Sequence, residues 1–363
     1  MFVITTRNFL PELGGMQILM SDIAHHLTNH GPVKVFAEDT NNYEEYDKKQ
    51  KFDVERIKGF KFIRKFRKAN QIQNYFQKNK NIRALISDHW KSIEKLSSNA
   101  CSSVSTICLI HGKEINHPNK SPLNIRMLRS LSKAKYVVAN SEFTKDLAIE
   151  KGIPEEKIKI INPGTTFETN EVLDEDSALQ IYSNAEPKII TVCRLEKRKG
   201  ISQTLLALKN YQARHENFRF VIIGDGEEKK ALENQTKELG LNRNVIFLND
   251  ISQNIKNSLI KTSDFFIMPS IQVGKSVEGF GISFLEAAKY GVPSIGGIAG
   301  GASDIIKHNE TGYLCDGEKH DEIYKYLIQI SENKNYEKLG ANAKIFSENF
   351  SWENQIKKYI ELI

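Results

Sequence analysis

Short apolar runs alternate with amphipathic stretches of helical length along the whole chain, and this alternation restricts the possible folds more than any other feature. Strands that are separated by helices pair in parallel, with helices covering both faces of the sheet. The candidate strands are residues 2–5, 33–37, 84–87, 105–110, 136–139 and 158–161 in the first half, and residues 188–192, 219–223, 245–247, 265–268 and 293–296 in the second. The pattern predicts an α/β protein built from βαβ units.

A polar stretch at residues 168–187 separates the two series of strands and lacks clear periodicity, as a linker does. We therefore expect two doubly wound, Rossmann-like domains, 1–169 and 186–349, that face each other across a cleft. Residues 350–363 have an amphipathic pattern with Ser351 as the expected N-cap, and we expect a helix that crosses back to the first domain. Open α/β sheets bind ligands beyond the carboxyl ends of their strands, so the functional residues are expected in the loops there.

The composition is that of an ordinary globular protein. The 363 residues are 40% hydrophobic, which is enough to fill two cores. No run of about 18 apolar residues exists, and the amino-terminal residues lack the pattern of a signal peptide, so we expect a cytoplasmic protein. The four cysteines show no CxxC spacing, which favours buried free thiols over a metal site.

The net charge of +6 is unevenly distributed. Residues 1–168 hold 27 Lys and Arg against 18 Asp and Glu, or +9, while the remainder holds 24 against 27, or −3. A basic first half indicates an anionic partner, which could be a membrane surface, a nucleic acid or a phosphorylated substrate. Charge alone does not choose among the three.

Two loops of the second half carry residues suited to phosphate. Arg194 and Lys199 lie in a basic turn after the strand at 188–192; a guanidinium places two donors on phosphate oxygens, and a lysine adds a point charge. Taken alone, this turn is more typical of solvated surface. Gly224 and Gly226 form a tight turn after the next strand, but no complete GxGxxG pattern is present, so a dehydrogenase has little support.

The segment 278–286 follows the strand at 265–268 and carries two glutamates eight residues apart. Glu278 is expected in a loop, and Glu286 in the opening turns of a helix that begins near residue 282. Gly279 and Gly281 leave backbone N–H groups accessible beside a helix N-terminus, which favours phosphate. Carboxylates accept hydrogen bonds from vicinal hydroxyls. This pattern suits a nucleotide sugar.

The first half has two candidate loops of its own. Gly14 and Gly15 follow the first strand and open a helix. His111 comes directly after the strand at 105–110 and precedes a glycine, so it is placed to reach a cleft, although a lone histidine is more often structural. Asn140, Ser141 and Asn162 occupy further turns of this kind and are expected to be supporting residues.

Six basic residues and no acidic ones lie in the stretch 58–68, which also contains three phenylalanines and an isoleucine. On a helical wheel the four apolar residues fall on one side and the basic residues, except Arg67, on the other, as in an interfacial helix at anionic lipid. The alternative is a helix that packs its phenylalanines on its own domain and exposes a solvated basic face. We predict membrane association through Lys58, Lys61, Arg64, Lys65 and Lys68. Nucleic-acid binding is not expected, because no recognised module accompanies the charge.

Residues 278–286 resemble the E-x7-E signature of the retaining, GT-B-fold glycosyltransferases of family 4. Arg194 with Lys199, the Gly224–Gly226 turn and the loop at residues 300–301 occur in the order and approximate spacing of that family, so the resemblance covers nearly the whole chain. Residues 268–270 together with 278–281 are similar to bacterial phosphatidylinositol mannosyltransferases of the PimB type. The resemblance implies a GT-B fold.

The resemblance also implies roles in the second domain. Arg194 and Lys199 would bind and neutralise the donor diphosphate, and Glu286 would accept from the ribose hydroxyls. Glu278 would hold hydroxyls of the transferred sugar, with the backbone amides of Phe280 and Gly281 nearby.

In the first domain, the family has a glycine pair at Gly14 and Gly15, in a loop that closes over the donor phosphates. His111 would contact the transferring sugar or polarise the reacting groups. Asp304 departs from the glutamate that many relatives carry, which puts the choice of sugar in doubt.

The implied activity is metal-independent, retaining transfer of a mannose- or glucose-type hexose from a GDP- or UDP-linked donor, without a prosthetic group. The acceptor would be lipid-linked or a glycan of the cell envelope, and the enzyme would lie peripherally on the inner face of the cytoplasmic membrane. The string at residues 174–176 resembles a metal-binding DxD motif, but it lies in the expected linker and is interpreted as a solvated acidic patch.

Three other classes remain possible from the sequence: a nucleotide-sugar epimerase of the same fold, a non-catalytic protein that binds membrane or nucleic acid, and a phosphorylase-like enzyme. The presence of Arg194, Lys199, Glu278 and Glu286 argues against the second. The third would need a cofactor-holding lysine, which no motif indicates. No oligomeric state is predicted.

Overall fold

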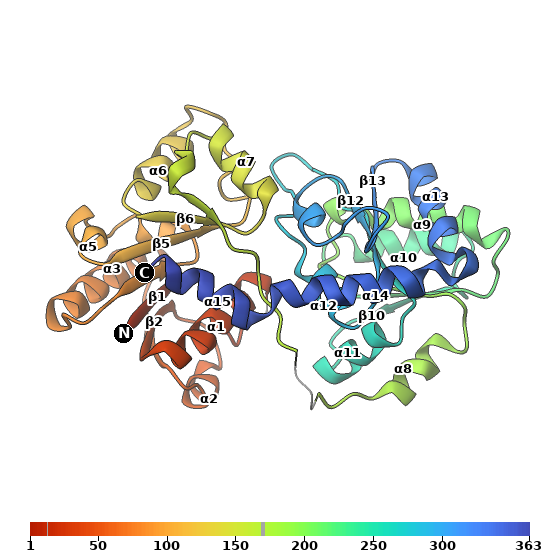
Figure 1. Cartoon of the computed structure of the whole chain (residues 1–363), viewed down its shortest axis with the longest axis horizontal. Coiled ribbons are helices and arrows are strands. Elements are labelled where there is room, and N and C mark those ends of the chain that lie inside the picture. The colour runs from red at the N-terminus through yellow and green to blue at the C-terminus, as the bar shows by residue number, and fades with distance from the viewer. Residues whose placement is uncertain (13, 168–170) are drawn as a thin grey trace. The chain divides into compact units, whose positions relative to one another are not determined.

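The structure, a computed structural model, describes residues 1–12, 14–167 and 171–363 (Figure 1). The chain divides into two compact units. The first comprises Met1–Gly164 and Trp352–Ile363, and the second comprises Thr165–Ser351. Each unit contains one parallel sheet whose two faces are both covered by helices, so the predicted α/β class with two Rossmann-like units is confirmed.

The first unit is built on a seven-stranded sheet in the order β3-β2-β1-β4-β5-β6-β7. Its strands are β1 (Phe2–Thr6), β2 (Val33–Glu38), β3 (Asp53–Ile57), β4 (Ala84–Ser87), β5 (Ser105–Ile110), β6 (Tyr136–Ala139) and β7 (Ile158–Ile160). The chain winds outward in one direction from β1 and then in the other from β4. The loops after β1 and β4 therefore diverge at a topological switch point, which is where doubly wound sheets bind ligands.

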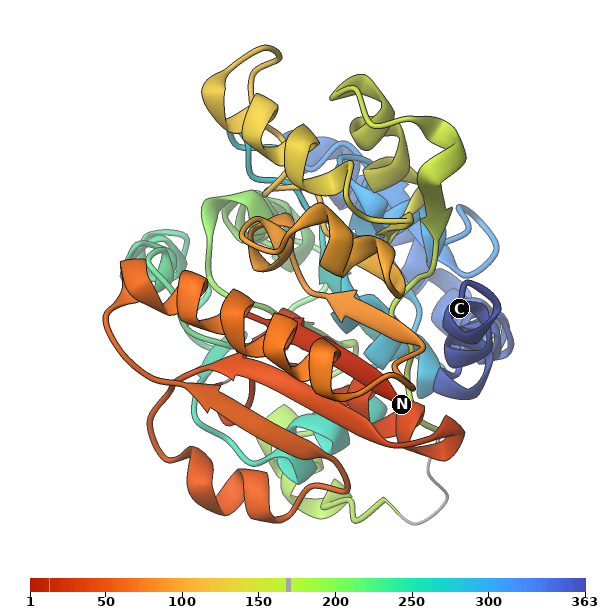
Figure 2. The ribbon, with the colours of Figure 1, turned by 90° about the vertical axis from the view of Figure 1, so that its left-hand side faces the viewer.

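Helices cover both faces of this sheet because successive strand residues point to opposite sides. Val3 packs on one face with residues of α3, α4 and α6, while Phe2 and Ile4 pack on the other with α1 and α15. Figure 2 shows α3 lying along its face of the sheet. The helices are α1 (Gly15–Leu27), α2 (Tyr43–Lys48), α3 (Lys61–Lys78), α4 (Trp90–Ile93), α5 (Ser98–Ser102), α6 (Pro122–Leu131), α7 (Glu142–Glu150) and α15 (Trp352–Glu361), with 3₁₀ turns η1 (Thr28–His30) and η2 (Glu155–Lys157).

The second unit repeats this winding in a six-stranded sheet, β10-β9-β8-β11-β12-β13, with its switch point between β8 and β11. The strands are β8 (Lys188–Val192), β9 (Arg219–Ile223), β10 (Val245–Leu248), β11 (Phe265–Met268), β12 (Ser294–Gly297) and β13 (Gly312–Cys315). The helices are α8 (Glu175–Tyr182), α9 (Ile201–Gln212), α10 (Lys229–Glu238), α11 (Gln253–Lys261), α12 (Ile282–Lys289), α13 (His320–Ser331) and α14 (Asn335–Ser347), with 3₁₀ turns η3 (Lys197–Lys199), η4 (Gly301–Asp304), η5 (Glu332–Lys334) and η6 (Glu348–Phe350).

All eleven predicted strands are present, with ends that differ by at most one residue, but the sequence analysis missed β3 and β13. Both are edge strands. Strand β3 has the sequence DVERI and is mostly half-buried, so its charged residues hide the strand pattern. Strand β13 is only four residues long and begins with a glycine. Edge strands need fewer apolar residues because one side of the ladder is unpaired.

The stretch expected to be a linker contains helix α8. Asp174 caps it by accepting a hydrogen bond from the Ser177 N–H at 3.1 Å, so the acidic string initiates a helix and is not merely a solvated patch. Ala178 and Tyr182, four residues apart, are buried against α11. Eight residues are too short a segment to reveal a helix by periodicity, which needs a longer window. Residues 168–170, where the first domain was expected to end, lie outside the described residues.

The boundaries between the units also differ from those expected. Thr165 belongs to the second unit because its N–H donates to the carbonyl of Phe350 at 2.8 Å. Phe350 belongs there too, since its ring packs on Phe280. Helix α15 therefore begins directly after Ser351 and is part of the first unit, where it lies beside α1 (Figure 1).

Trp352 opens α15 and is buried among polar groups of α1. His26 stacks on its ring at 5.4 Å, and the Trp352 side chain is hydrogen-bonded to Asp22. Burial raises the pKa of Asp22 from 3.8 to about 6, although the Trp352 hydrogen bond opposes the shift. The folded protein therefore binds a proton more tightly than the unfolded chain, and the charged carboxylate lowers the free energy of unfolding as the pH rises from 3.8 to about 6.

We predict that Asp22→Asn raises the melting temperature at pH 7 to 8, because the amide keeps the acceptor for Trp352 and removes the buried charge. The gain should vanish at pH 4, where Asp22 is protonated in the folded state. Thermal unfolding of both proteins from pH 4 to 8 measures this, with Asp146→Asn on α7 as a control. An equal gain at pH 4 and pH 8 would show that burial of the charge is not the cause.

Candidate active site

The switch point of the second unit brings the loops after β8 and β11 together around one carboxylate. Glu278, in the loop after β11, accepts at Oε2 from Nη1 of Arg198 at 2.7 Å and from Nζ of Lys199. Lys199 is buried and the other two side chains are largely buried. Burial raises the pKa of Glu278, but the charges of Lys199 and Arg198 outweigh it and hold the pKa below 4.5. Glu278 is thus an ionised acceptor at pH 7.

Arg198 was not singled out from the sequence, although it lies in the same basic turn as Lys199. Its Nε also donates to Glu196 at 2.8 Å, so its planar fork is held by two carboxylates. Arg194, which the sequence favoured, does not contact Glu278 but shares the carboxylate of Glu196 with Arg198. Its side chain is 67% exposed and makes only a 3.5 Å ion pair with Glu196 among the described residues. Arg198 could have been found from its residue type, because a planar guanidinium binds paired oxygens better than a lysine does.

The loop after β9 packs closely on the loop after β8. The Leu195 N–H donates to the Asp225 carbonyl at 2.9 Å. A Cβ at Gly224 would overlap the Cys193 carbonyl oxygen, and one at Gly226 would overlap that of Leu195. Both glycines, which were expected to form a tight turn, are therefore required for the close contact between these two loops.

Helix α12 follows Glu278 with Gly281 as its N-cap. Glu286, on this helix, pairs with Lys256 of α11 at 2.7 Å and is partly exposed. The side chain of Phe280 is buried in the core beside Phe350, so only its backbone is available to a ligand. Gly279 lies between the two glutamates as expected. Lys256 is a further residue of this edge that the sequence did not indicate.

The loop after β12 is attached to Glu278 through the backbone. The Gly301 N–H donates to the Glu278 carbonyl at 3.0 Å, and Glu278 and Gly300 form a parallel bridge. Gly300 has a φ of 110°, and a Cβ there would overlap the Glu278 carbonyl oxygen. Asp304 ends the 3₁₀ turn that follows. The structure thus joins three loops, after β8, β11 and β12, at one residue.

In the first unit, His111 lies at the carboxyl end of β5 and is half-buried. Its Nε2 lies 3.0 Å from the Asp88 carbonyl, and its N–H donates to Oε1 of Glu114 at 2.5 Å. A carbonyl oxygen only accepts, so Nε2 donates to Asp88. This bond holds the His111 ring in one orientation at the end of β5.

Asp88 fixes this region. Its buried carboxylate accepts from the Thr6 hydroxyl at 3.0 Å, the Arg7 N–H at 2.9 Å and the Ser92 hydroxyl at 2.6 Å. The loops after β1 and β4 are thereby tied together, and the Asp88 carbonyl orients His111. Sequence reasoning missed Asp88, whose partners Thr6 and Arg7 are more than 80 residues away, and it missed Glu114, which binds the His111 backbone within the same loop.

The remaining residues expected in this unit form turns. Gly14 is the N-cap of α1 and Gly15 its first residue, while Leu13 lies outside the described residues. Ser141 caps α7 by accepting from the Thr144 N–H at 3.1 Å. Asn162 donates to the Asn140 carbonyl at 3.0 Å. The ring of Trp352 fills the space beside Gly164.

Helix α3 does not expose all the basic residues that were predicted to contact a membrane. Lys68 is buried, donates to the Thr6 carbonyl at 2.7 Å and pairs with Glu38, so it cannot contact a membrane. Arg64 is also turned inward, to Glu38 at 3.6 Å. Burial lowers the pKa of Lys68, which the carboxylates of Asp88 and Glu38 oppose. The placement of Lys68 and Arg64 on an exposed basic face was wrong, because polar groups at the end of the sheet attract them inward.

The apolar residues of the same helix are exposed instead. Phe60 and Phe62 are 77% and 70% exposed, and Ile63 and Phe66 are also exposed. The Nζ atoms of Lys65 and Lys95 lie 5.4 and 4.9 Å from the centroid of the Phe66 ring. Lys58 and Arg67 are exposed nearby in the sequence, and the side chain of Lys61 lies outside what the structure describes. We call Phe60, Phe62, Ile63 and Phe66 the aromatic patch.

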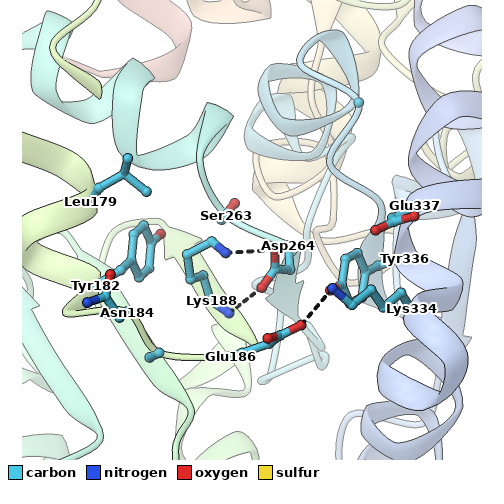
Figure 3. A pocket seen from close by; sticks show the side chains of 12 residues that line it. Leu179, Tyr182, Asn184, Glu186, Lys188, Ser263, Asp264, Lys334, Tyr336 and Glu337 are labelled. Carbon is cyan, nitrogen blue, oxygen red and sulfur yellow. Dashed lines mark hydrogen bonds and ion pairs between the residues drawn. The ribbon is translucent and has the colours of Figure 1, made fainter. Parts of the chain in front are cut away.

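A cavity of about 510 Å³ lies elsewhere in the second unit (Figure 3). Lys188 begins β8 and Asp264 precedes β11, so this cavity is at the amino ends of the strands, opposite the ligand-binding edge. Its charges neutralise one another: Lys188 pairs with Asp264 at 3.1 Å and Lys334 with Glu186 at 3.0 Å. We therefore place the candidate site at the carboxyl edge and not in this cavity.

No group of three or more His, Cys, Asp or Glu side chains suited to a metal ion occurs in residues 1–12, 14–167 and 171–363. Over the same residues no helix is long and apolar enough to span a membrane.

Two consecutive Rossmann-like units of this kind define the GT-B class of fold. Two family models match the chain, Glycosyltransferase Family 4 over residues 13–168 and Glycosyl transferases group 1 over residues 175–346. The chain belongs to this family, the group 1, family 4 glycosyltransferases, as the E-x7-E resemblance implied.

Among its relatives, an uncharacterized glycosyltransferase of Methanocaldococcus jannaschii is 29% identical over 62% of this chain and 57% of the relative. The GDP-mannose-dependent α-(1-6)-phosphatidylinositol monomannoside mannosyltransferase of Mycobacterium tuberculosis is 26% identical over 61% of this chain and 58% of that enzyme. The chain thus matches little more than half the length of these relatives. The enzyme of the same name from Mycolicibacterium smegmatis is 22% identical over 99% of this chain and 97% of its own length.

The fold is shared with solved structures. HepE of Anabaena in complex with UDP has a TM-score of 0.81 and 19% identity, covering 99% of this chain and 98% of HepE. The same protein has also been solved with UDP-glucose. At this identity the likeness confirms the GT-B fold.

We predict that Glu278→Gln lowers the free energy of unfolding at pH 7 by about 3 kcal/mol, because Arg198 and Lys199 lose their buried counter-ion. The difference from wild type should shrink below pH 4.5, since a carboxyl with a lowered pKa loses its stabilising charge as the pH falls through that pKa. Urea unfolding at pH 3.5, 5 and 7 tests this, with the exposed Glu227→Gln as the control. A destabilisation that is the same at all three pH values would contradict the ion-pair explanation.

Proposed function

We propose that this protein is a retaining, metal-independent hexosyltransferase that uses a GDP- or UDP-linked mannose- or glucose-type donor. The observation that carries the proposal is the cluster of Glu278, Arg198 and Lys199 at the switch point of the second unit. The reaction leaves a nucleoside diphosphate, so the site must stabilise negative charge on phosphate oxygens. Two preorganised cations at the ligand-binding edge meet that need without a metal ion.

In this proposal the donor diphosphate binds Arg198, Lys199 and the exposed Arg194. Arg198 and Lys199 then contact both the diphosphate and Glu278. The ionised Glu278 carboxylate accepts from hydroxyls of the transferred sugar, and Glu286 accepts from the ribose hydroxyls. As the bond between the anomeric carbon and the phosphate oxygen breaks, the acceptor hydroxyl attacks the same face and its proton passes to the departing phosphate. His111 polarises the reacting groups through Nδ1, and the loop at Gly14 and Gly15 binds the donor phosphates.

The names of similar proteins point to two donors, which differ in both base and sugar. The mycobacterial relatives are named for GDP-mannose, and HepE was solved with UDP-glucose. We propose a lipid-linked or glycan acceptor of the cell envelope, by analogy with the mycobacterial mannosyltransferases, whose names specify a phosphatidylinositol acceptor. The reaction would then take place beside the cytoplasmic face of the membrane.

A panel of nucleotide sugars in a thermal-shift assay tests the donor, because a ligand that binds only the folded protein raises the melting temperature. One of GDP-mannose and UDP-glucose should give the largest shift, and release of nucleoside diphosphate should follow. Lys199→Met and Arg198→Ala should each lower the rate of release by about 10- to 100-fold, since a charge-assisted hydrogen bond contributes about 1.5–3 kcal/mol. Arg194→Ala should also lose most of the activity.

Lys197→Ala is the matched control for that panel, because Lys197 is exposed in the same turn and should leave the rate unchanged. Product analysis without an acceptor separates the proposal from an epimerase, which would convert the sugar and release no diphosphate. Unchanged release in Arg198→Ala and Lys199→Met would refute the assignment of the diphosphate site.

We propose that the aromatic patch attaches the enzyme to anionic membrane. The exposed rings of Phe60 and Phe62 insert among the lipids, and Lys65 and Lys95, which lie against Phe66, meet the phosphates. The proposal keeps the apolar side of the predicted interfacial helix and omits two of its predicted basic contacts. Arg64 and Lys68 hold the helix to its sheet and have no part in the attachment.

We predict that Phe62→Ser combined with Phe66→Ser lowers the affinity for vesicles of phosphatidylcholine and phosphatidylglycerol by at least about tenfold, because burying a phenylalanine contributes about 1.5–3 kcal/mol. Co-sedimentation measures this. Ile345→Ser, at an equally exposed residue of α14, is the control and should bind like wild type. Binding that survives the double substitution would exclude the aromatic patch as the membrane anchor.

A further inference from the structure

The switch point of the first unit holds two cations that the proposed donor chemistry does not use. Arg7 directly follows β1, and Lys91 follows β4 in the opening turn of α4. Both side chains are half-buried. The Arg7 N–H is bound to Asp88, and the Lys91 N–H donates to Nδ1 of His89 at 2.9 Å, so the two residues are held on adjoining loops.

Neither charge is neutralised by a carboxylate. In the part of the chain that the structure describes, no hydrogen bond or ion pair is found for the Arg7 guanidinium or the Lys91 ammonium. The nearby carboxylates have other partners: Asp88 accepts from Thr6 and Ser92, Glu94 binds Arg126 at 2.7 Å, and Glu114 accepts from the His111 N–H.

Further cationic groups surround the same position. The buried ring of Trp90 has Lys91 Nζ at 5.1 Å and Arg126 Cζ at 5.9 Å from its centroid, and His117 lies against its edge. His89 is also beside Trp90, and its burial, together with the charges of Arg7 and Lys91, lowers its pKa to about 2. His89 is therefore neutral, and the positive charge of the region belongs to the arginines and Lys91.

A half-buried charge without a counter-ion is unfavourable unless a ligand supplies the counter-ion. A guanidinium and an ammonium on adjoining loops match a phosphate group, which has paired oxygens for the fork and a third for the point charge. His111, oriented by the Asp88 carbonyl, lies at the same edge. A phosphate bound by Arg7 and Lys91 therefore lies on the side of the sheet where His111 acts.

We infer that Arg7 and Lys91 form the binding site for a phosphate ester carried by the acceptor, so that the substrate of this enzyme is an anionic, phosphate-bearing alcohol. This inference rests on the proposed function. It adds the chemical class of the acceptor, and it gives two of the excess positive charges of the first unit a role. A phosphate ester can belong to a soluble molecule or to a phospholipid headgroup, and the same two cations serve both.

Calorimetric titration of the full chain tests the site with two probes, sn-glycerol 3-phosphate and dioctanoyl phosphatidylglycerol below its micellar concentration. Arg7→Met and Lys91→Met should each weaken binding of the probes at least about tenfold, because each removes a charge-assisted contact. Tighter binding of the lipid assigns the phosphate to a phospholipid, and equal binding assigns it to a soluble ester. Failure of wild type to bind either probe overturns the inference.

Lys80→Met is the matched control, since Lys80 is exposed at the opposite, amino-terminal edge of β4 and should not change binding. Nucleoside diphosphate binding is measured on the same variants. It should be unchanged in Arg7→Met and Lys91→Met, and a parallel loss would assign the two cations to the donor and refute the inference. If no protein, wild type included, binds or cleaves a nucleotide sugar, the proposed function fails independently of the phosphate result.

Stability separates a ligand site from a structural one. Removal of one of two cations without counter-ions should leave the melting temperature unchanged or raise it, whereas loss of a structural ion pair lowers it. A marked fall in melting temperature for both variants would contradict a role in ligand binding.

Discussion

The buried carboxylate of Glu278, held by Arg198 and Lys199, is the interaction on which the second unit's ligand edge depends. Its side chain joins the loops after β8 and β11, and its carbonyl accepts from Gly301 in the loop after β12. A buried ion pair is weak support for overall stability, but it fixes the positions of its members. In the proposed function the two cations are thus oriented before a donor arrives, which is the condition for electrostatic stabilisation of a leaving group.

The two units use the same topology with different charge arrangements. Both sheets follow the strand order 3-2-1-4-5-6, which a seventh strand extends in the first unit, and both place cations in loops at the switch point. In the second unit, Glu278 neutralises them. In the first, Asp88 is committed to the Thr6 and Ser92 hydroxyls, which leaves Arg7 and Lys91 without a carboxylate partner among the described residues. The cations of the second unit are thus paired with a carboxylate, whereas those of the first unit are not.

In helix α3 the predicted separation of apolar from basic residues is correct, but two of the basic residues point toward the sheet. Its wheel separates apolar from basic residues, and burial of the apolar side is the usual outcome for a surface helix. Here Glu38 of β2 and the Thr6 carbonyl at the end of β1 provide partners for Lys68, and they bring the basic side inward. The aromatic patch is exposed as a consequence. No local pattern contains this information, because the deciding partners lie 30 and 62 residues away in the chain.

Local sequence determined the core strands, because runs such as residues 105–110 can only be buried, and their alternation with helices determined parallel pairing. The spacing of Glu278 and Glu286 indicated the donor segment, and Lys199 the cationic turn. Tertiary structure decided which groups meet: Arg198 with Glu278 across 80 residues, Asp88 with Thr6 across 82, and α8 with α11 in a stretch that looked unstructured. The physical reason is that backbone periodicity follows from neighbours in sequence, whereas the partner of a buried charge is chosen by the packing of distant loops.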